Sequence, residues 1–500
     1  MHGLTVVLPY RGQPWFERMR QELLKCPAAL EMIAVHPAVC KPAQGVCRSF
    51  EAASMTGGAL WNRLIREART AYLLLIQDDR EIAWGPGAMM RMVDVAETTK
   101  AGMVYADYYD LHGSLRREHP VNDYQLGSIR DDFHFGPVRL VSVSAARSAL
   151  EKYGAIPDLI HAGLYDLRLK ISMDHPLFHL QEYLYTKVAH AEEPLSTQDG
   201  GRQERMPAVE EKHFAYVDPR QQAVQREMEA VAVAHLQRLG AWLEPAFKEV
   251  PASGLRFPVE ASVIIPVRNR CQTMADAVQS ALSQQTDFPF NVIVVDNHSS
   301  DGTTPLLAGL ARKYPAMMHL IPGRTDLGIG GCWNEAVFAD CCGRYAVQLD
   351  SDDLYSGPHV LQKIVDVFKR GRCAMVVGAY TLVNEKLEEI PPGLIDHKEW
   401  TDDNGRNNAL RINGLGAPRA FRTDLLRQTG FLNVSYGEDY AMALRLLREY
   451  RLERIYESLY LCRRWEDNTD AGLSVEKANR NDAFKDKIRT LEIMARRSAV

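Results

Sequence analysis

The stretch Tyr345-Ala-Val-Gln-Leu-Asp-Ser-Asp-Asp353 decides the fold of this chain. Its apolar residues 345–349 predict a short buried strand that stops in a cluster of carboxylates. Side chains alternate along a strand, so Asp350 and Asp352 point the same way if the extended geometry persists. Two such carboxylates repel each other unless a cation lies between them, and oxygen ligands suit Mg²⁺ or Mn²⁺ shared with a phosphate. The alternative is a solvated acidic turn.

Size and composition set the class of protein. With 500 residues the chain is too long for one core, so two or more domains are expected. Its 46% hydrophobic and 25% charged residues are ordinary for a soluble globular protein. A formal net charge of −5 argues against a dedicated nucleic-acid binder, so no nucleic-acid partner is expected.

The location of the protein is predicted from three features. No apolar run is long enough to span a bilayer, and the first ten residues show no signal-peptide pattern. Nine scattered cysteines, with Cys341 and Cys342 adjacent and no CxxC pair, favour reduced thiols. These features predict a cytoplasmic protein. Peripheral membrane association through a surface patch or a partner stays open, as does assembly into a homo-oligomer.

The same order of strands and motifs occurs twice, and strands alternating with helices predict a largely parallel, doubly wound α/β sheet. Chance gives one such match but hardly five in order, so we interpret the chain as a tandem duplication. The matched pairs are residues 263–268 with 6–11, the strand ending at Asp296 with the strand ending at His36, Gly330-Gly331-Cys332-Trp333-Asn334 with the Gly57-to-Asn62 set, 345–352 with 72–79, and Gly357-Pro358 with Gly85-Pro86.

The copies are joined by a linker. Residues 196–205 are polar and predict a loop, and Asp218-Pro219 begins a helix whose apolar stripe runs to about Trp242. That stripe is expected to pack against one copy or to bridge both. Residues 251–258 complete the linker, and residues 479–497 predict a final charged helix. The domains are therefore 1–200, a linker at 201–258, and 259–500.

Over roughly residues 260–470 the second copy resembles the family 2 glycosyltransferases of the GT-A fold. The matching motifs are Val263-Ile264-Ile265-Pro266, residues 294–303 (Val-Val-Asp-Asn-His-Ser-Ser-Asp-Gly-Thr), Leu327-Gly328 through Asn334, Asp350-Ser351-Asp352-Asp353, and Gly437-Glu438-Asp439-Tyr440. The resemblance implies two tandem GT-A domains, Rossmann-like and doubly wound with a mixed sheet, joined by a helical linker. The first is a degenerate copy.

The resemblance also implies a role for each motif residue. Asp296 accepts a hydrogen bond from the nucleotide base, which favours a UDP-sugar donor and leaves other bases open, while Ser299 and Asp301 shape the nucleotide pocket. Asp352 binds Mn²⁺ or Mg²⁺ directly, and Asp350 lies near the metal and the ribose. The donor site is completed by Pro266, Arg268, Asn334, Ser351 and Arg464.

The base is implied in the same way: Asp439 is the catalytic base, with Glu438 beside it. The chemistry asks for such groups. A divalent cation stabilises the leaving diphosphate, and a carboxylate or His must take the proton of the attacking hydroxyl. The alternative for Asp439 is a helix N-cap. Many relatives carry a metal-binding His where this chain has Trp465, which puts the third metal ligand in doubt.

The first copy keeps the scaffold and loses these residues. It has His36 where Asp296 stands in the second copy, Gln77-Asp78-Asp79 in place of Asp350-Ser351-Asp352, and Leu164 in place of the base. A leucine cannot accept a proton. A vestigial metal site of Asp79 and His190 is one alternative, and a domain kept for packing, dimerisation or acceptor binding is the simpler one.

The function expected is an inverting, divalent-metal-dependent glycosyltransferase that moves a sugar from a nucleotide-sugar donor to a hydroxyl of a glycan, lipid-linked or protein acceptor. The acceptor pocket is expected within residues 404–422. Two alternatives are a bifunctional transferase with both copies active and a non-catalytic sugar- or nucleotide-binding scaffold. A nucleotidyltransferase is less favoured because no glycine-rich activation loop follows residues 263–266.

Overall fold

The computed structural model describes residues 3–40, 48–77, 79–189, 221–464 and 473–498. The first half holds a nine-stranded sheet in the order β3-β2-β1-β4-β8-β6-β9-β5, with β7 paired to β6. Its strands are β1 (Leu4–Pro9), β2 (Ala29–His36), β3 (Arg48–Glu51), β4 (Tyr72–Ile76), β5 (Glu81–Trp84), β6 (Met103–His112), β7 (Leu115–His119), β8 (Val138–Ser142) and β9 (Leu177–Ala189). Its helices are α1 (Phe16–Leu24), α2 (Gly58–Glu67), α3 (Ala88–Thr99), α4 (Val143–Tyr153) and α5 (Gly163–Ser172).

The second half repeats this topology strand for strand, in the order β12-β11-β10-β13-β17-β15-β18-β14, with β16 paired to β15. Its strands are β10 (Ala261–Val267), β11 (Phe290–Asp296), β12 (Met317–Leu320), β13 (Tyr345–Gln348), β14 (Leu354–Tyr355), β15 (Met375–Val383), β16 (Glu389–Ile395), β17 (Arg419–Arg422) and β18 (Leu452–Arg463). Its helices are α8 (Met274–Leu282), α9 (Thr303–Lys313), α10 (Ile329–Phe338), α11 (Val360–Arg370), α12 (Gly405–Asn408), α13 (Thr423–Thr429) and α14 (Glu438–Leu447).

Strand directions agree between the halves as well. β1 is parallel to β2 and β4, as β10 is to β11 and β13. β8 runs antiparallel to β4, as β17 does to β13. The predicted tandem α/β fold with mixed, doubly wound sheets is therefore confirmed, and β1 to β9 correspond in order to β10 to β18.

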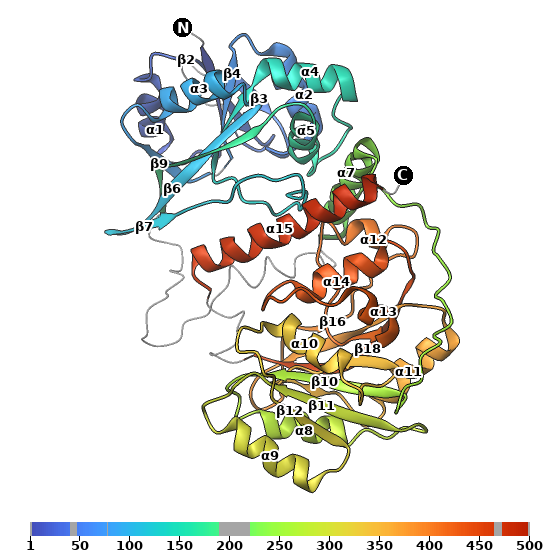
Figure 1. The fold of residues 1–500 in the computed structure, drawn as a ribbon. Helices are drawn as coiled ribbons and strands as arrows, with labels where there is room; N and C mark the ends of the chain where they lie inside the picture. The colour runs from blue at the N-terminus through green and yellow to red at the C-terminus, as the bar shows by residue number, and fades with distance from the viewer. Residues whose placement is uncertain (1–2, 41–47, 78, 190–220, 465–472, 499–500) are drawn as a thin grey trace.

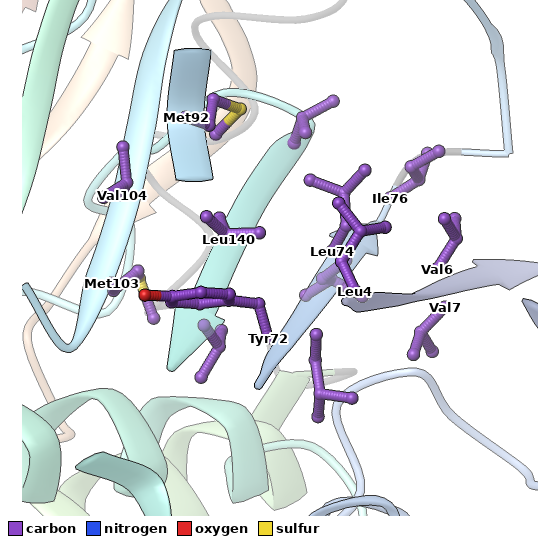
Figure 2. Packing of buried hydrophobic residues seen from close by; sticks show 14 of the residues in the cluster. Leu4, Val6, Val7, Tyr72, Leu74, Ile76, Met92, Met103, Val104 and Leu140 are labelled. Carbon is purple, nitrogen blue, oxygen red and sulfur yellow. The ribbon is translucent and has the colours of Figure 1, made fainter. Parts of the chain in front are cut away.

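The continuous apolar runs of the sequence form the centre of each sheet because helices cover both faces there. All five residues of β4 are buried, as are all six of β1. Figure 2 shows this packing in the first half, where Met92 of α3 lies over the sheet close to Leu140 of β8 and Val104 of β6.

Two helices join the halves, and Figure 1 shows α15 (Val475–Arg497) running between them with α7 (Gln222–Leu239) at its C-terminal end. Both helices were expected, although the Asp218-Pro219 start and the 196–205 loop lie outside the described residues. From α7, the Glu227 carboxylate accepts hydrogen bonds from the backbone of Ile160, His161 and Ala162 at the start of α5. Asn404 donates to Glu229 on the other side. The linker helix therefore bridges both halves.

A buried ionic network on α15 ties the first half to α14. Asp486 is 0% exposed and contacts Arg130 of the first half at 3.2 Å and Arg489 at 2.7 Å. Ser128 also donates to Asp486 at 2.8 Å. Arg489 donates in turn to the Tyr440 hydroxyl at 3.1 Å, in the first turn of α14. Residues of the first half, α15 and α14 all take part in this network, so each of these parts helps to position the other two.

Among the described residues, no helix is both long and apolar enough to cross a membrane.

Replacing Asp486 by Asn leaves Arg130 and Arg489 buried with less compensating charge, and removing one partner of a buried pair costs roughly 3–5 kcal/mol. Because Arg130 also contacts Asp132 and Asp482, we expect the lower part of that range. Urea unfolding followed by circular dichroism measures the effect. Asp174→Asn, which removes the exposed Lys152 pair, is the control and should lose much less stability because solvent screens that pair. Equal losses in the two variants would contradict the network's role.

Candidate active site

Three carboxylates gather where β13 ends, as the opening stretch predicted. Asp350 accepts hydrogen bonds from the Gln348 amide at 3.0 Å on both oxygens. Asp352 lies 3.6 Å from the Arg270 guanidinium. Asp353, which was expected in the cluster but given no role of its own, is buried and accepts a hydrogen bond from the Arg463 backbone N–H at 2.8 Å. Burial raises the pKa of Asp350 and, further, that of Asp353, and the neighbouring carboxylates add to both shifts.

Arg463 supports this cluster from the end of β18. Its side chain donates to the Asp352 carbonyl and lies 3.2 Å from the Asp276 carboxylate of α8. The predicted donor-binding residue was its neighbour Arg464, whose backbone N–H donates to Val383 of β15 at 2.7 Å. The structure therefore brings Arg463 to the acidic cluster through its side chain and its backbone.

The predicted base lies at the start of α14. Gly437 is the N-cap with φ of 80°, a left-handed conformation that suits glycine, and Glu438 and Asp439 occupy the first turn. The N-cap alternative for Asp439 is thus wrong. Asp439 pairs with Arg419 at 2.6 Å. Glu438 is 7% exposed, and its Oε2 has no hydrogen-bond partner among the described residues. Burial, with the charge of Asp439, raises the pKa of Glu438 to about 8.

Arg419 and Gln348 connect the two acidic groups. The Arg419 guanidinium donates to the Gln348 side-chain oxygen at 2.9 Å while it holds Asp439, and the Gln348 amide donates to Asp350. A continuous chain thus runs from the end of β13 to the start of α14. The sequence analysis missed both linking residues. A polar Gln348 inside an otherwise apolar strand was the available signal.

On the nucleotide side, Asp296 organises the turn that follows β11. It is 0% exposed, and its oxygens accept hydrogen bonds from the Ser299 backbone at 3.0 Å and the Thr304 hydroxyl at 2.6 Å. His319 lies 3.4 Å away. Burial alone would raise the pKa of Asp296, but the hydrogen bonds from Thr304 and Ser299 outweigh it and lower the pKa below its usual value.

The turn after β11 is fastened to the loop after β10. Asp301 accepts hydrogen bonds from the Cys271 backbone at 3.0 Å and the Thr303 hydroxyl at 2.6 Å. These bonds, that of Thr303 first, hold its pKa well below the usual range. The Ser299 hydroxyl accepts from Asn269 at 3.0 Å. Other predicted donor residues border this region: Arg268 is exposed just after β10, Pro266 is partly buried within it, and the Ser351 carbonyl accepts from Thr273 at 3.0 Å.

Asn334 has a framework role that the sequence did not predict. Its amide exchanges two hydrogen bonds with the Phe431 backbone, at 2.7 and 3.0 Å, and so fastens α10 to the segment ahead of α14. Asn62 makes the same pair of bonds to Ile156 in the first half. Because the half without the acidic cluster keeps this contact, the motif serves packing in both. The neighbouring Trp333 is buried and packs against Phe421 and Phe431.

The first half has residues at the corresponding positions, but these residues lack most of the carboxylates of the second half. Helix α5 begins at Gly163 as α14 begins at Glu438, so Leu164 takes the place of Asp439. Asp79 is exposed, and Gln77 follows β4 where Asp350 follows β13. His190, Asp78 and Trp465, which entered the predictions for vestigial and intact metal sites, lie outside the described residues.

Within the described ranges, no three His, Cys, Asp or Glu side chains form a group that could hold a metal ion. The donor chemistry still suits a cation with further ligands from a diphosphate. Asp350, Asp352 and Asp353 are close enough for each charge to affect its neighbours, and the burial of Asp350 and Asp353 leaves little water to offset them.

The comparison with protein families concerns the second half of the chain. Residues 262–429 match the model described as glycosyl transferase family 2. Over these residues the second half is therefore similar to family 2 glycosyltransferases.

Curated relatives match shorter segments. The uncharacterised glycosyltransferase YfnE of Bacillus subtilis is 29% identical over 146 residues, which is 28% of this chain and 35% of that protein. An uncharacterised protein of Mycobacterium tuberculosis is 27% identical over 109 residues, 22% of this chain and 31% of that protein. The matched segments thus span about a third of these relatives' lengths.

Solved structures give weaker likenesses. Staphylococcus aureus TarS residues 1–349 in complex with UDP-GlcNAc has a TM-score of 0.37 at 22% identity, over 48% of this chain and 73% of that one. The mannosyltransferase PcManGT from Pyrobaculum calidifontis, in complex with GDP-Man and Mn²⁺, has a TM-score of 0.33 at 17% identity, over 58% of this chain and 84% of that one.

The raised pKa of Glu438 makes stability depend on pH. Its carboxyl is held protonated in the folded protein, so the stabilisation is complete below its ordinary pKa of 4.5 and is lost as pH rises through about 8. We expect Glu438→Gln, which cannot ionise, to lose less stability than the parent between pH 6 and pH 9. Thermal unfolding midpoints at the two pH values test this. Parallel losses in both proteins would show that Glu438 does not titrate in this range.

Proposed function

We propose that this protein is an inverting, divalent-metal-dependent glycosyltransferase with its active site in the second half. It transfers a sugar from a nucleotide-sugar donor, with UDP-sugars favoured, to a hydroxyl of a glycan, lipid-linked or protein acceptor. The observation that carries the proposal is the chain from Asp350 through Gln348 and Arg419 to Asp439. Its first three residues lie inside the segment that matches the family model, and Asp439 follows ten residues after that segment ends. This chain of contacts joins the acidic cluster on the proposed donor side to the proposed base, Asp439.

Asp439 is the proposed base. It is only partly buried, so an acceptor hydroxyl can reach it, and Arg419 holds its carboxylate in one orientation. Glu438, with its raised pKa, is protonated at neutral pH and does not compete for the proton. A carboxylate that takes the proton directly while the hydroxyl attacks from the face opposite the leaving group accounts for inversion.

The donor is proposed to lie across the ends of β10, β11 and β13. The turn built on Asp296, Ser299 and Asp301 is braced against the loop after β10 and forms a rigid wall for the nucleotide. Asp352, with Asp350 behind it, would hold Mn²⁺ or Mg²⁺ together with the diphosphate, and the ion would stabilise charge on the leaving group. The mannosyltransferase PcManGT, which is similar in part, was solved with GDP-Man and Mn²⁺.

The first half is proposed to be non-catalytic. Leu164 and Gly163 stand where Asp439 and Glu438 stand in the second half, so no carboxylate is placed to take a proton. This supports one active site per chain over a bifunctional enzyme.

Asp439→Asn should lower sugar transfer or donor hydrolysis by about 10²- to 10⁴-fold, the usual range for removing a general base. Donor binding should change little. The assay screens the whole chain against a panel of nucleotide sugars with Mn²⁺, and calorimetry measures donor binding. Asp340→Asn, an exposed change elsewhere in the same half, is the control and should keep full turnover. Unchanged turnover in Asp439→Asn would remove the base assignment.

Asp352→Asn should act differently and weaken metal-dependent donor binding itself. Chelation of the divalent ion should have the same effect on the parent protein. Equal donor affinity with and without the metal would contradict the metal role of Asp352.

A further inference from the structure

The first half retains an arginine whose partner it has lost. Arg139 of β8 lies opposite Leu75 of β4, and the same register places Arg419 of β17 opposite Gln348 of β13. Since the two sheets share one topology, Arg139 occupies the position of Arg419. In the second half that guanidinium binds a carboxylate and an amide. In the first half both partners are leucines, Leu164 and Leu75.

The Arg139 guanidinium is consequently short of partners. Its Nε is shielded from solvent and has no hydrogen-bond partner among the described residues. Burial, with the nearby charge of Arg168, lowers the pKa of Arg139 to about 9. The residue as a whole is partly exposed.

A second guanidinium has been added beside it. Arg168 lies one helical turn after Leu164 on α5 and therefore on the same face, which in α14 carries the base. It is 3% exposed. Its Nη2 donates to the Arg130 carbonyl at 2.5 Å, and its Nη1 has no hydrogen-bond partner among the described residues. The residue at the corresponding position of α14 is Ala443, one turn after Asp439.

Aromatic rings enclose both guanidiniums. Arg139 lies 4.7 Å and Arg168 5.2 Å from the centre of the Phe135 ring. Arg168 also lies 4.7 Å from the Tyr165 ring. Such contacts recover less free energy than burying an unpaired charge costs. The two arginines therefore remain under-compensated.

The residue that follows β4, next to these two arginines, has also lost a negative charge relative to the second half. Gln77 stands where Asp350 stands in the second half, and its Oε1 is buried without a hydrogen-bond partner among the described residues. The backbone N–H of Gln77 donates to the carbonyl of Pro137, which lies two residues before Arg139. The side chains of Gln77 and Arg139 therefore emerge on the same face of the sheet. An amide here can donate to an anion, whereas a carboxylate would repel one.

From this reversal of charge we propose that the first half binds an oxyanion, a phosphate or carboxylate group of a sugar ligand, at Arg139 and Arg168. Guanidinium groups pair with both anions through charge-assisted hydrogen bonds, and Gln77 donates a further bond. The anion fills the place that the Asp439 carboxylate takes in the second half. The site is separate from the proposed transferase site and does not depend on its activity.

Thermal unfolding of the whole chain tests this with two probes, inorganic phosphate and glucuronate, against sodium chloride at equal ionic strength. A ligand that binds only the folded state raises the midpoint. We expect at least one probe to raise it, and Arg139→Met and Arg168→Met each to weaken the binding measured by calorimetry at least about tenfold. A response to phosphate alone assigns a phosphoryl ligand, and a response to glucuronate alone assigns a carboxylate sugar.

The control is Arg147→Met, a first-half arginine that donates to the backbone of Ile65 and Ala68 and should keep the response. In the absence of anion, Arg168→Met should be at least as stable as the parent because an under-compensated charge has been removed. The proposal is overturned if neither probe shifts the parent beyond chloride, or if Arg139→Met and Arg168→Met both keep the shift. Should one of these variants fail to fold, the other decides.

Discussion

The acidic site of the second half depends on the ion pair and the hydrogen bond that the Arg419 guanidinium makes. Four carboxylates, Asp350, Asp352, Asp353 and Asp439, come from two separate segments of the chain and would repel each other without cations between them. Arg419 neutralises Asp439 and orders Gln348, which in turn holds Asp350. Arg463 and Arg270 serve the other end of the cluster. The negative charge that remains uncompensated would be offset by the divalent cation proposed for this site.

The two halves share one scaffold but differ in the charge of the side chains at corresponding positions. The sheets agree in strand order and direction, and the asparagines at positions 62 and 334 make the same backbone contacts. Packing therefore constrains both halves alike. The acidic side chains are free to differ because they sit at strand ends and at the first turn of a helix, where they add little to the core. Arg139, which lies within a strand, was kept after its partners had gone.

The halves are not independent bodies. Helix α15 carries a buried carboxylate between arginines of both sides and reaches the first turn of α14 through Tyr440. Helix α7 caps α5 with Glu227 and bonds to Asn404. The position of Asp439, the proposed base, thus rests partly on contacts with the first half. This gives a physical reason why a degenerate copy persists, apart from any ligand it binds.

Much of this protein was determined by the sequence itself. The apolar runs ending in turns predicted the strands, and the repeated motifs predicted the duplication, because strand burial and tight glycine contacts are local demands on residue type. The acidic motifs predicted the segments that form the site. The sequence did not reveal roles for Arg419, Gln348 and the unpaired Arg139 in a site. Their roles come from the pairing of β13 with β17 and from the approach of α14, and only tertiary structure brings such distant charges within reach of one another.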